Sequence, residues 1–241
     1  MAALNIERTS VGRAFWLRWV LVNITGVVVG IALMFAGVGV LLDETPQAVF
    51  GAGIGAVFGT TLGTGQWLVL RRYLDGIGAW VPLTIVSWIV FWALNIAGAF
   101  PEGEGLAGKA VEGIWHGLVF GALVGVAQSI ALRGRVRGAG RWAIINGVCW
   151  SLSAAAGDVG NFLLDNPGGA DLLIGFLLAC GLTGLGMMWL LRRSARIAQG
   201  TEQCKNVLGR AYLPNLVEGV FSEVVCCGAH TALEHRHTPQ I

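Results

Sequence analysis

The chain has 241 residues, of which 55% are hydrophobic and only 12% are charged, and its mean hydropathy is +0.68. Soluble domains carry roughly 25% charged residues, so this composition excludes an ordinary soluble protein. Glycine accounts for 37 residues and proline for six, without the period of collagen. A net charge of +2 is too small to indicate a nucleic-acid partner. We therefore predict a membrane protein whose partner is the lipid bilayer.

Six stretches of the sequence are long and apolar enough to cross a bilayer, which requires about 20 mostly apolar residues. The sequence therefore predicts an all-α fold, a polytopic transmembrane bundle of six helices over residues 15–193, after a cytoplasmic segment of residues 1–14. The expected spans are residues 16–42, 48–70, 79–100, 110–132, 142–164 and 171–191.

The basic residues around these spans are distributed asymmetrically. Up to residue 196 the chain has 13 Lys and Arg residues, and twelve of them lie near the start of the first span, after the sixth, or beside the joins that follow the second and fourth spans. Only Lys109 lies on the other side. Because cytoplasmic loops retain an excess of Lys and Arg, we expect both termini in the cytoplasm.

The spans belong to an internal repeat. A shift of 62 residues aligns the second and third spans with the fourth and fifth, and superimposes Gln66 on Gln128 and Trp80 on Trp142. A shift of 61 aligns Trp19 with Trp80. The sequence thus predicts three parallel hairpins, about residues 15–72, 79–133 and 141–193, related by a pseudo-threefold axis along the membrane normal.

Two spans carry stripes of four glycines at intervals of four residues. Without a side chain, glycine allows close backbone approach, which holds helices together in lipid. We expect these stripes to pack helices within the chain, and the alternative is oligomerisation of several copies through the same faces. The stripes comprise Gly51, Gly55, Gly59 and Gly63, and Gly113, Gly117, Gly121 and Gly125.

Five polar residues recur at one depth near the cytoplasmic ends of the spans, and we call them the inner polar layer. Two readings are open: hydrogen bonds between neighbouring helices, each contributing about 0.6–2 kcal/mol, or the lining of a hydrated path. The layer comprises Asn23, Gln66, Thr84, Gln128 and Asn146.

A second polar group lies near the outer ends of the spans. Ionisable side chains within a span are costly and are functional candidates by default. The repeat places Phe50, Ile54 and Ile96 at the positions equivalent to three of these residues, so the fold does not require charge there. The group comprises Asn95, Glu112, His116, Asp158 and Asn161.

Several roles fit this second group. Glu112, His116 and Asp158 suit a divalent metal, while His116 alone suits a haem or a chlorophyll-type pigment. Histidine also relays protons near neutral pH, and a His–Asp pair can be purely structural. The sequence names no catalytic residue, no metal site and no cofactor, because it contains no nucleotide-binding glycine loop, nucleophile elbow or HExxH motif.

After the sixth span the composition becomes more polar, and we expect a cytoplasmic tail over residues 194–241. Apolar residues recur at helical spacing over about residues 213–227, which predicts an amphipathic helix on the membrane or on the bundle. The tail also holds Cys226, Cys227 and three histidines, but their spacing matches no established metal finger.

The segment GTGQWLVLRR, from Gly63 to Arg72, is followed by Trp80 and returns in weaker form in later repeats, with Ser129 for Trp67 and Met187 for Gln66. Residues 15–193 thereby resemble a group of bacterial six-span membrane proteins with repeated glycine-zipper GxxQWLVLRR hairpins and no established activity. The resemblance implies the architecture and a bacterial inner (cytoplasmic) membrane.

For the function we expect a non-enzymatic membrane bundle. It acts either as a permeation unit for small solutes or ions, or as an assembly subunit of a larger membrane complex or homo-oligomer. The alternative is an accessory protein that binds haem, pigment or metal through His116, and an intramembrane enzyme is the third hypothesis.

Overall fold

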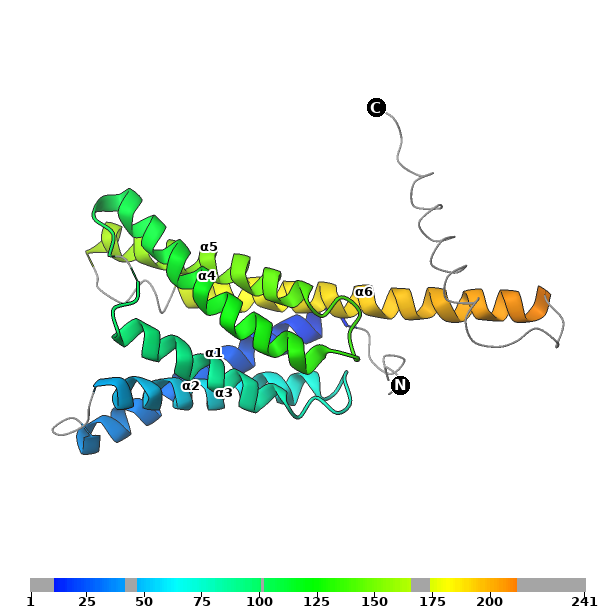
Figure 1. The fold of residues 1–241 in the computed structure, drawn as a ribbon, viewed down its shortest axis with the longest axis horizontal. Helices are drawn as coiled ribbons and strands as arrows, with labels where there is room; N and C mark the ends of the chain where they lie inside the picture. Colours follow the sequence, from blue (N-terminus) through cyan, green and yellow to red (C-terminus); the bar gives the residue numbers. More distant parts are fainter. Residues whose placement is uncertain (1–10, 42–46, 101, 166–173, 212–241) are drawn as a thin grey trace, which may run out of the picture. The chain divides into compact units, whose positions relative to one another are not determined.

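The computed structural model describes residues 11–41, 47–100, 102–165 and 174–211. Within these ranges the chain is all-α, with six helices and no strand (Figure 1). The helices are α1 (Arg13–Leu41), α2 (Gln47–Leu70), α3 (Trp80–Ile96), α4 (Gly105–Leu132), α5 (Arg141–Leu164) and α6 (Phe176–Ala211).

Three helices differ from the expected spans in a way that matters for the site. Helix α3 ends at Ile96, because Gly98 adopts a φ of +66°, a left-handed conformation that often ends helices. Helix α4 begins at Gly105, so Lys109 lies within it and not in a loop. Helix α6 continues to Ala211, well past the expected end at residue 191. The amphipathic helix expected over residues 213–227 lies outside the described residues.

Three of the helices are long and apolar enough to cross a membrane, which identifies the chain as a membrane protein. These segments are Arg13–Ala36, Gly105–Leu132 and Phe176–Thr201. Helix α3 is apolar but has only 17 residues. The sequences of α2 and α5 contain many Gly, Ser, Thr and Asn residues, which lower their hydropathy.

The chain divides into two compact units, Met1–Arg192 and Arg193–Ile241. In the first unit both glycine stripes are packing faces. A Cβ atom on Gly59 would lie 2.6 Å from the Cα of Ile85 in α3, and one on Gly121 would lie 2.5 Å from the carbonyl oxygen of Asn146 in α5. All eight stripe glycines meet α3 or α5 in this way, so the stripes pack α2 against α3 and α4 against α5 within one chain and join consecutive predicted hairpins.

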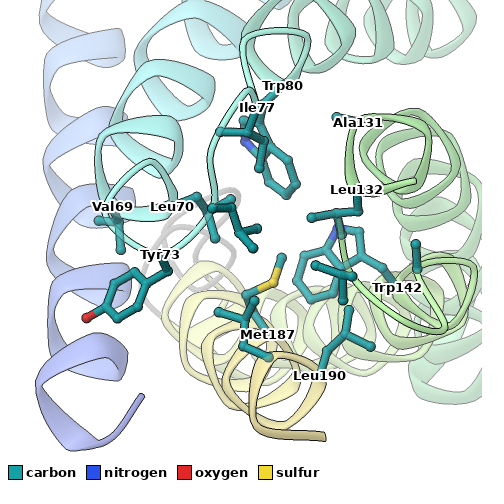
Figure 2. Packing of buried hydrophobic residues seen from close by; sticks show 14 of the residues in the cluster. Val69, Leu70, Tyr73, Ile77, Trp80, Ala131, Leu132, Trp142, Met187 and Leu190 are labelled. Carbon is teal, nitrogen blue, oxygen red and sulfur yellow. The ribbon is translucent and has the colours of Figure 1, made fainter. Parts of the chain in front are cut away.

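A hydrophobic cluster fills the end of this unit where α2 and α4 finish and α3 and α5 begin. Side chains such as Leu70, Leu132 and Met187 point toward one another there (Figure 2). We call it the inner cluster; its members are Val11, Phe15, Trp19, Val69, Leu70, Tyr73, Leu74, Ile77, Trp80, Ala131, Leu132, Val136, Ala139, Trp142, Met187, Leu190 and Leu191.

The close approach of α2 to α3 predicts a difference between two glycines of the same helix. Gly59→Leu forces the backbones apart and should lower the free energy of unfolding in detergent by about 1–3 kcal/mol, the usual cost of overpacking. Gly53 has no neighbouring atom within 4 Å, so Gly53→Leu should leave the thermal midpoint unchanged. Equal effects of the two changes on the midpoint would contradict this packing.

Candidate functional site

Three tryptophans near the starts of α1, α3 and α5 meet within the inner cluster. The ring centroids of Trp19, Trp80 and Trp142 are 6.4, 6.2 and 6.4 Å apart, and all three side chains are buried. A buried indole N–H needs an acceptor. Trp80 Nε1 donates to Gln66 Oε1 (3.1 Å) and Trp142 Nε1 to Gln128 Oε1 (2.8 Å).

The third tryptophan finds a different acceptor. Met187 of α6 stands four residues before a Leu-Arg pair, as the two glutamines do, and a thioether is a weak acceptor. Trp19 Nε1 instead donates to Thr183 Oγ1, one turn earlier in α6, at 3.3 Å. The aligned positions in α2 and α4 are apolar, Leu62 and Val124. Thr183 therefore supplies the acceptor that Met187 does not.

All five residues of the inner polar layer surround this tryptophan triad. Gln66 Nε2 donates to Asn23 Oδ1 (2.8 Å), and Gln128 Nε2 donates to Gln66 Oε1 (3.1 Å) and Thr84 Oγ1 (3.0 Å). Asn23 and Asn146 each donate to the carbonyl oxygen of the tryptophan four residues earlier. Side-chain hydrogen bonds thus connect α1 to α2, α2 to α3 and α4, α3 to α4, and α4 to α5.

The space beside the inner polar layer is small. A cavity of about 20 Å³ lies between Asn23, Gln66, Gln128, Asn146 and aromatic neighbours, which is room for about one water molecule. Because the inner cluster fills the bundle beyond it, the layer works as a set of interhelical hydrogen bonds in this structure. Of the two readings offered by the sequence, the geometry supports the structural one.

A much larger cavity of about 550 Å³ opens at the opposite end of the first unit, between α3, α4, α5 and the start of α6; we call it the outer chamber. Its size falls in the range of small-molecule sites. Its lining combines aromatic rings with titratable and polar side chains: Phe91, Asn95, Gly98, Phe100, Glu102, Glu112, His116, Trp150, Ser153, Ala154, Asp158, Gly175 and Phe176.

Three titratable residues of the outer polar group come together in this chamber. Glu112 and His116 lie one turn apart on α4, and Asp158 approaches from α5. One potential ligand atom from each lies within 4.8 Å of the other two, and all three residues are half-buried. The ring of Phe100 lies 4.5 Å, centroid to centroid, from the imidazole of His116.

The carboxylate of Glu112 is held by two donors. Its Oε2 accepts hydrogen bonds from Lys109 Nζ at 2.7 Å and from the backbone N–H of Gly103 at 2.9 Å. The lysine pair is an ion pair between residues three apart on α4. Both bonds use the same oxygen atom of the carboxylate.

The two asparagines of the outer group take different positions. Asn95 lines the chamber, but it lies one residue before the end of α3, where its carbonyl accepts the N–H of Gly98, and not five or six residues inside a span as expected. Asn161 lies one turn beyond Asp158 on α5 and is not among the described residues that line the chamber.

Sequence reasoning missed other residues of the chamber. Glu102 and Phe100 lie in the join between α3 and α4. The sequence predicts Phe100 as the last residue of a span and assigns no role to Glu102. Phe91 of α3, Trp150 of α5 and Phe176 of α6 also line the chamber. The only signal in the sequence for these lining residues is the high content of aromatic residues in α3 and α5, which is also typical of ordinary helix packing.

No family model matches the chain, and no curated protein or solved structure shows significant similarity to it. The inner polar layer and the outer chamber are therefore the features that indicate a function.

The hydrogen bonds of Gln128 predict a measurable loss of stability. Gln128→Met preserves approximate volume but removes the acceptor of Trp142 and the donor to Thr84, so the free energy of unfolding in detergent should fall by about 1–3 kcal/mol. Thr61 is a matched control, because its hydroxyl donates only to carbonyls of its own helix, and Thr61→Val should change the value by less than about 0.5 kcal/mol. If Gln128→Met is as stable as Thr61→Val, the layer does not hold the helices together.

Proposed function

We propose that the protein is a six-span membrane protein whose bundle forms a one-ended chamber for a small cationic ligand. The main support is the contrast between the two ends of the first unit. The outer chamber has a volume of about 550 Å³, whereas the inner cluster, which includes the tryptophan triad, fills the other end. Because the inner end is filled with side chains, the bundle is better suited to binding a ligand than to conducting solutes along an open path. The proposal develops the hypothesis of an accessory binding protein.

The exposed faces of the helices support six spans. Helix α3 exposes Val86, Val90 and Leu94, and α5 exposes Ile144, Val148 and Leu152, each at intervals of four residues. Polar residues such as Asn146 and Thr84 are buried on the opposite faces of these helices. Apolar surface outside and hydrogen-bonded polar groups inside suit a lipid environment. Local thinning of the bilayer accommodates the 17 residues of α3.

The tryptophan triad supports a threefold repeat. Three indoles at aligned sequence positions lie at nearly equal mutual distances, and two of them use aligned glutamines. Three hairpins around one axis would produce this pattern. A homo-oligomer or larger complex would use other faces, since the glycine stripes contact α3 and α5.

The charges of the chamber favour a cation. Glu102, Glu112 and Asp158 contribute three carboxylates, while Lys109 beside Glu112 contributes one ammonium group. A partly enclosed cleft with an excess of one charge concentrates ions of the opposite charge. The arginine-rich loops are at the other end of the bundle, so the positive-inside rule orients the chamber away from the cytoplasm. The GxxQWLVLRR resemblance supports a bacterial inner membrane.

Orientation is tested with cysteines in a variant that lacks the five native ones. An impermeant thiol reagent should label Glu104→Cys in intact cells and should label Gly140→Cys only after permeabilisation. Both positions are exposed, and Gly140 has open space around its Cα. Labelling of Gly140→Cys in intact cells would reverse the orientation.

Access to the chamber is tested on a single helix. Ala154→Cys, which lines the chamber, should react from outside with the same reagent, whereas Leu152→Cys should not, because Leu152 is 58% exposed on the face proposed to meet lipid. Met187→Cys, in the closed inner cluster, should stay unreactive from both sides. Equal reactivity of Ala154→Cys and Leu152→Cys would refute a water-accessible chamber, and reactivity of Met187→Cys would indicate a path through the centre.

A further inference from the structure

We propose that Glu112, His116 and Asp158 bind one divalent first-row transition metal ion, with Zn²⁺ as the reference ion. The inference rests on the proposed chamber and names the class of its ligand. It goes beyond a general attraction for cations, because an imidazole among carboxylates discriminates between metals.

The donor set fits such an ion. Imidazole nitrogen and carboxylate oxygen both bind Zn²⁺ at about 2.0–2.2 Å, whereas Ca²⁺ requires six to eight oxygen ligands. Three protein ligands leave a further coordination position for water or a second ligand. The chamber provides room for that molecule, since its volume is about 550 Å³.

The three side chains need to move only a short distance to bind one ion together. The three ligand atoms lie within 4.8 Å of one another, and ligands around a tetrahedral ion at the distances above are about 3.4 Å apart. Glu112 and His116 share one face of α4, so only Asp158 on α5 has to be brought in from another helix. Small rotamer changes of these half-buried side chains suffice for the difference.

Glu112 is already oriented by outer partners. Gly103 N–H and Lys109 Nζ both bond Oε2 of Glu112, which leaves Oε1 for a metal ion. Hydrogen bonds to a ligating carboxylate are the usual support of a metal site. These hydrogen bonds to Glu112 distinguish the cluster from carboxylates that merely lie near one another on a protein surface.

The internal repeat supplies an independent argument. The positions aligned with Glu112, His116 and Asp158 hold Phe50, Ile54 and Ile96, and Ile54 is buried in a hydrophobic cluster of the bundle. The packed pair α2–α3 therefore forms with apolar residues at the aligned positions. Half-buried ionisable groups are costly within a span, and metal coordination explains why three of them converge.

The test uses the full chain, purified in detergent through a tag without histidine. The tail has its own possible ligands, so the reference variant carries Cys204→Ser, Cys226→Ser, Cys227→Ser, His230→Gln, His235→Gln and His237→Gln, which leaves His116 as the sole histidine. Calorimetric titration with Zn²⁺ should give one site per chain, and Zn²⁺ should raise the thermal midpoint. Added Co²⁺ should give visible absorption bands that depend on His116.

In that reference variant, His116→Gln and Asp158→Asn should each weaken Zn²⁺ binding at least tenfold, the smallest loss typical of changes around metal ligands. Ser153→Ala is the matched control, since Ser153 lines the same chamber and donates to the carbonyl of Cys149, and it should bind Zn²⁺ normally. The thermal midpoint of each variant without metal shows whether it is folded.

Absence of Zn²⁺ binding by the folded reference variant, or unchanged affinity in folded His116→Gln, would overturn the metal site. Ca²⁺ binding equal to that of Zn²⁺ would also overturn it, because the imidazole would then have no role. The thiol labelling of Ala154→Cys is independent of metal. Labelling without metal binding would refute the site and leave the chamber, whereas an inaccessible Ala154→Cys would refute the chamber itself.

Discussion

A buried indole N–H is costly without an acceptor, and the way three tryptophans find acceptors organises the inner end of the bundle. Among the described residues, only the indole N–H of Trp92 is buried without a hydrogen-bond partner. Trp80 and Trp142 donate to Gln66 and Gln128. The glutamines then direct their own amide groups to Asn23 and Thr84 on neighbouring helices. Each bond fixes the rotation of a helix about its axis. Apolar contacts alone would leave that rotation poorly defined. The tryptophan triad therefore sets the register in which the glycine stripes and the inner cluster pack.

The same need for an acceptor explains how one hairpin departs from the others. With Met187 in place of glutamine, α6 offers no amide, and Trp19 turns to Thr183. Helix α6 thereby lacks the amide bridges that join the other helices. Indole hydrogen bonds from Trp16 and Trp19, together with the packing of Gly184 against both rings, join it to α1. The outer chamber is likewise bordered by α6, through Gly175 and Phe176. The less regular hairpin is thus the one beside the candidate site.

Much of the fold is readable from the sequence, because apolar length, glycine spacing and the position of tryptophan are local properties. The six helices, the contacts of Gly59 and Gly121 and the interhelical bonds of Gln66 and Gln128 follow from such patterns. The site is only partly readable. The ionisable residues Glu112, His116 and Asp158 are conspicuous in apolar stretches of the sequence, but their convergence depends on how α4 crosses α5. Glu102 and Phe100 join them because α3 stops at Ile96, an end set by the conformation of Gly98.

In the proposed six-span bundle, the brevity of α3 has a consequence for the surrounding lipid. Its 17 residues cover about 26 Å at 1.5 Å per residue, several ångströms less than a hydrocarbon core of about 30 Å. A bilayer adapts to such hydrophobic mismatch by thinning around the short segment, at a cost that grows with each ångström. The end of α3 also carries Asn95 into the chamber wall, so in that arrangement a change in bilayer thickness would act on the segment that borders the chamber. Membranes of different thickness would then act differently on that wall of the chamber.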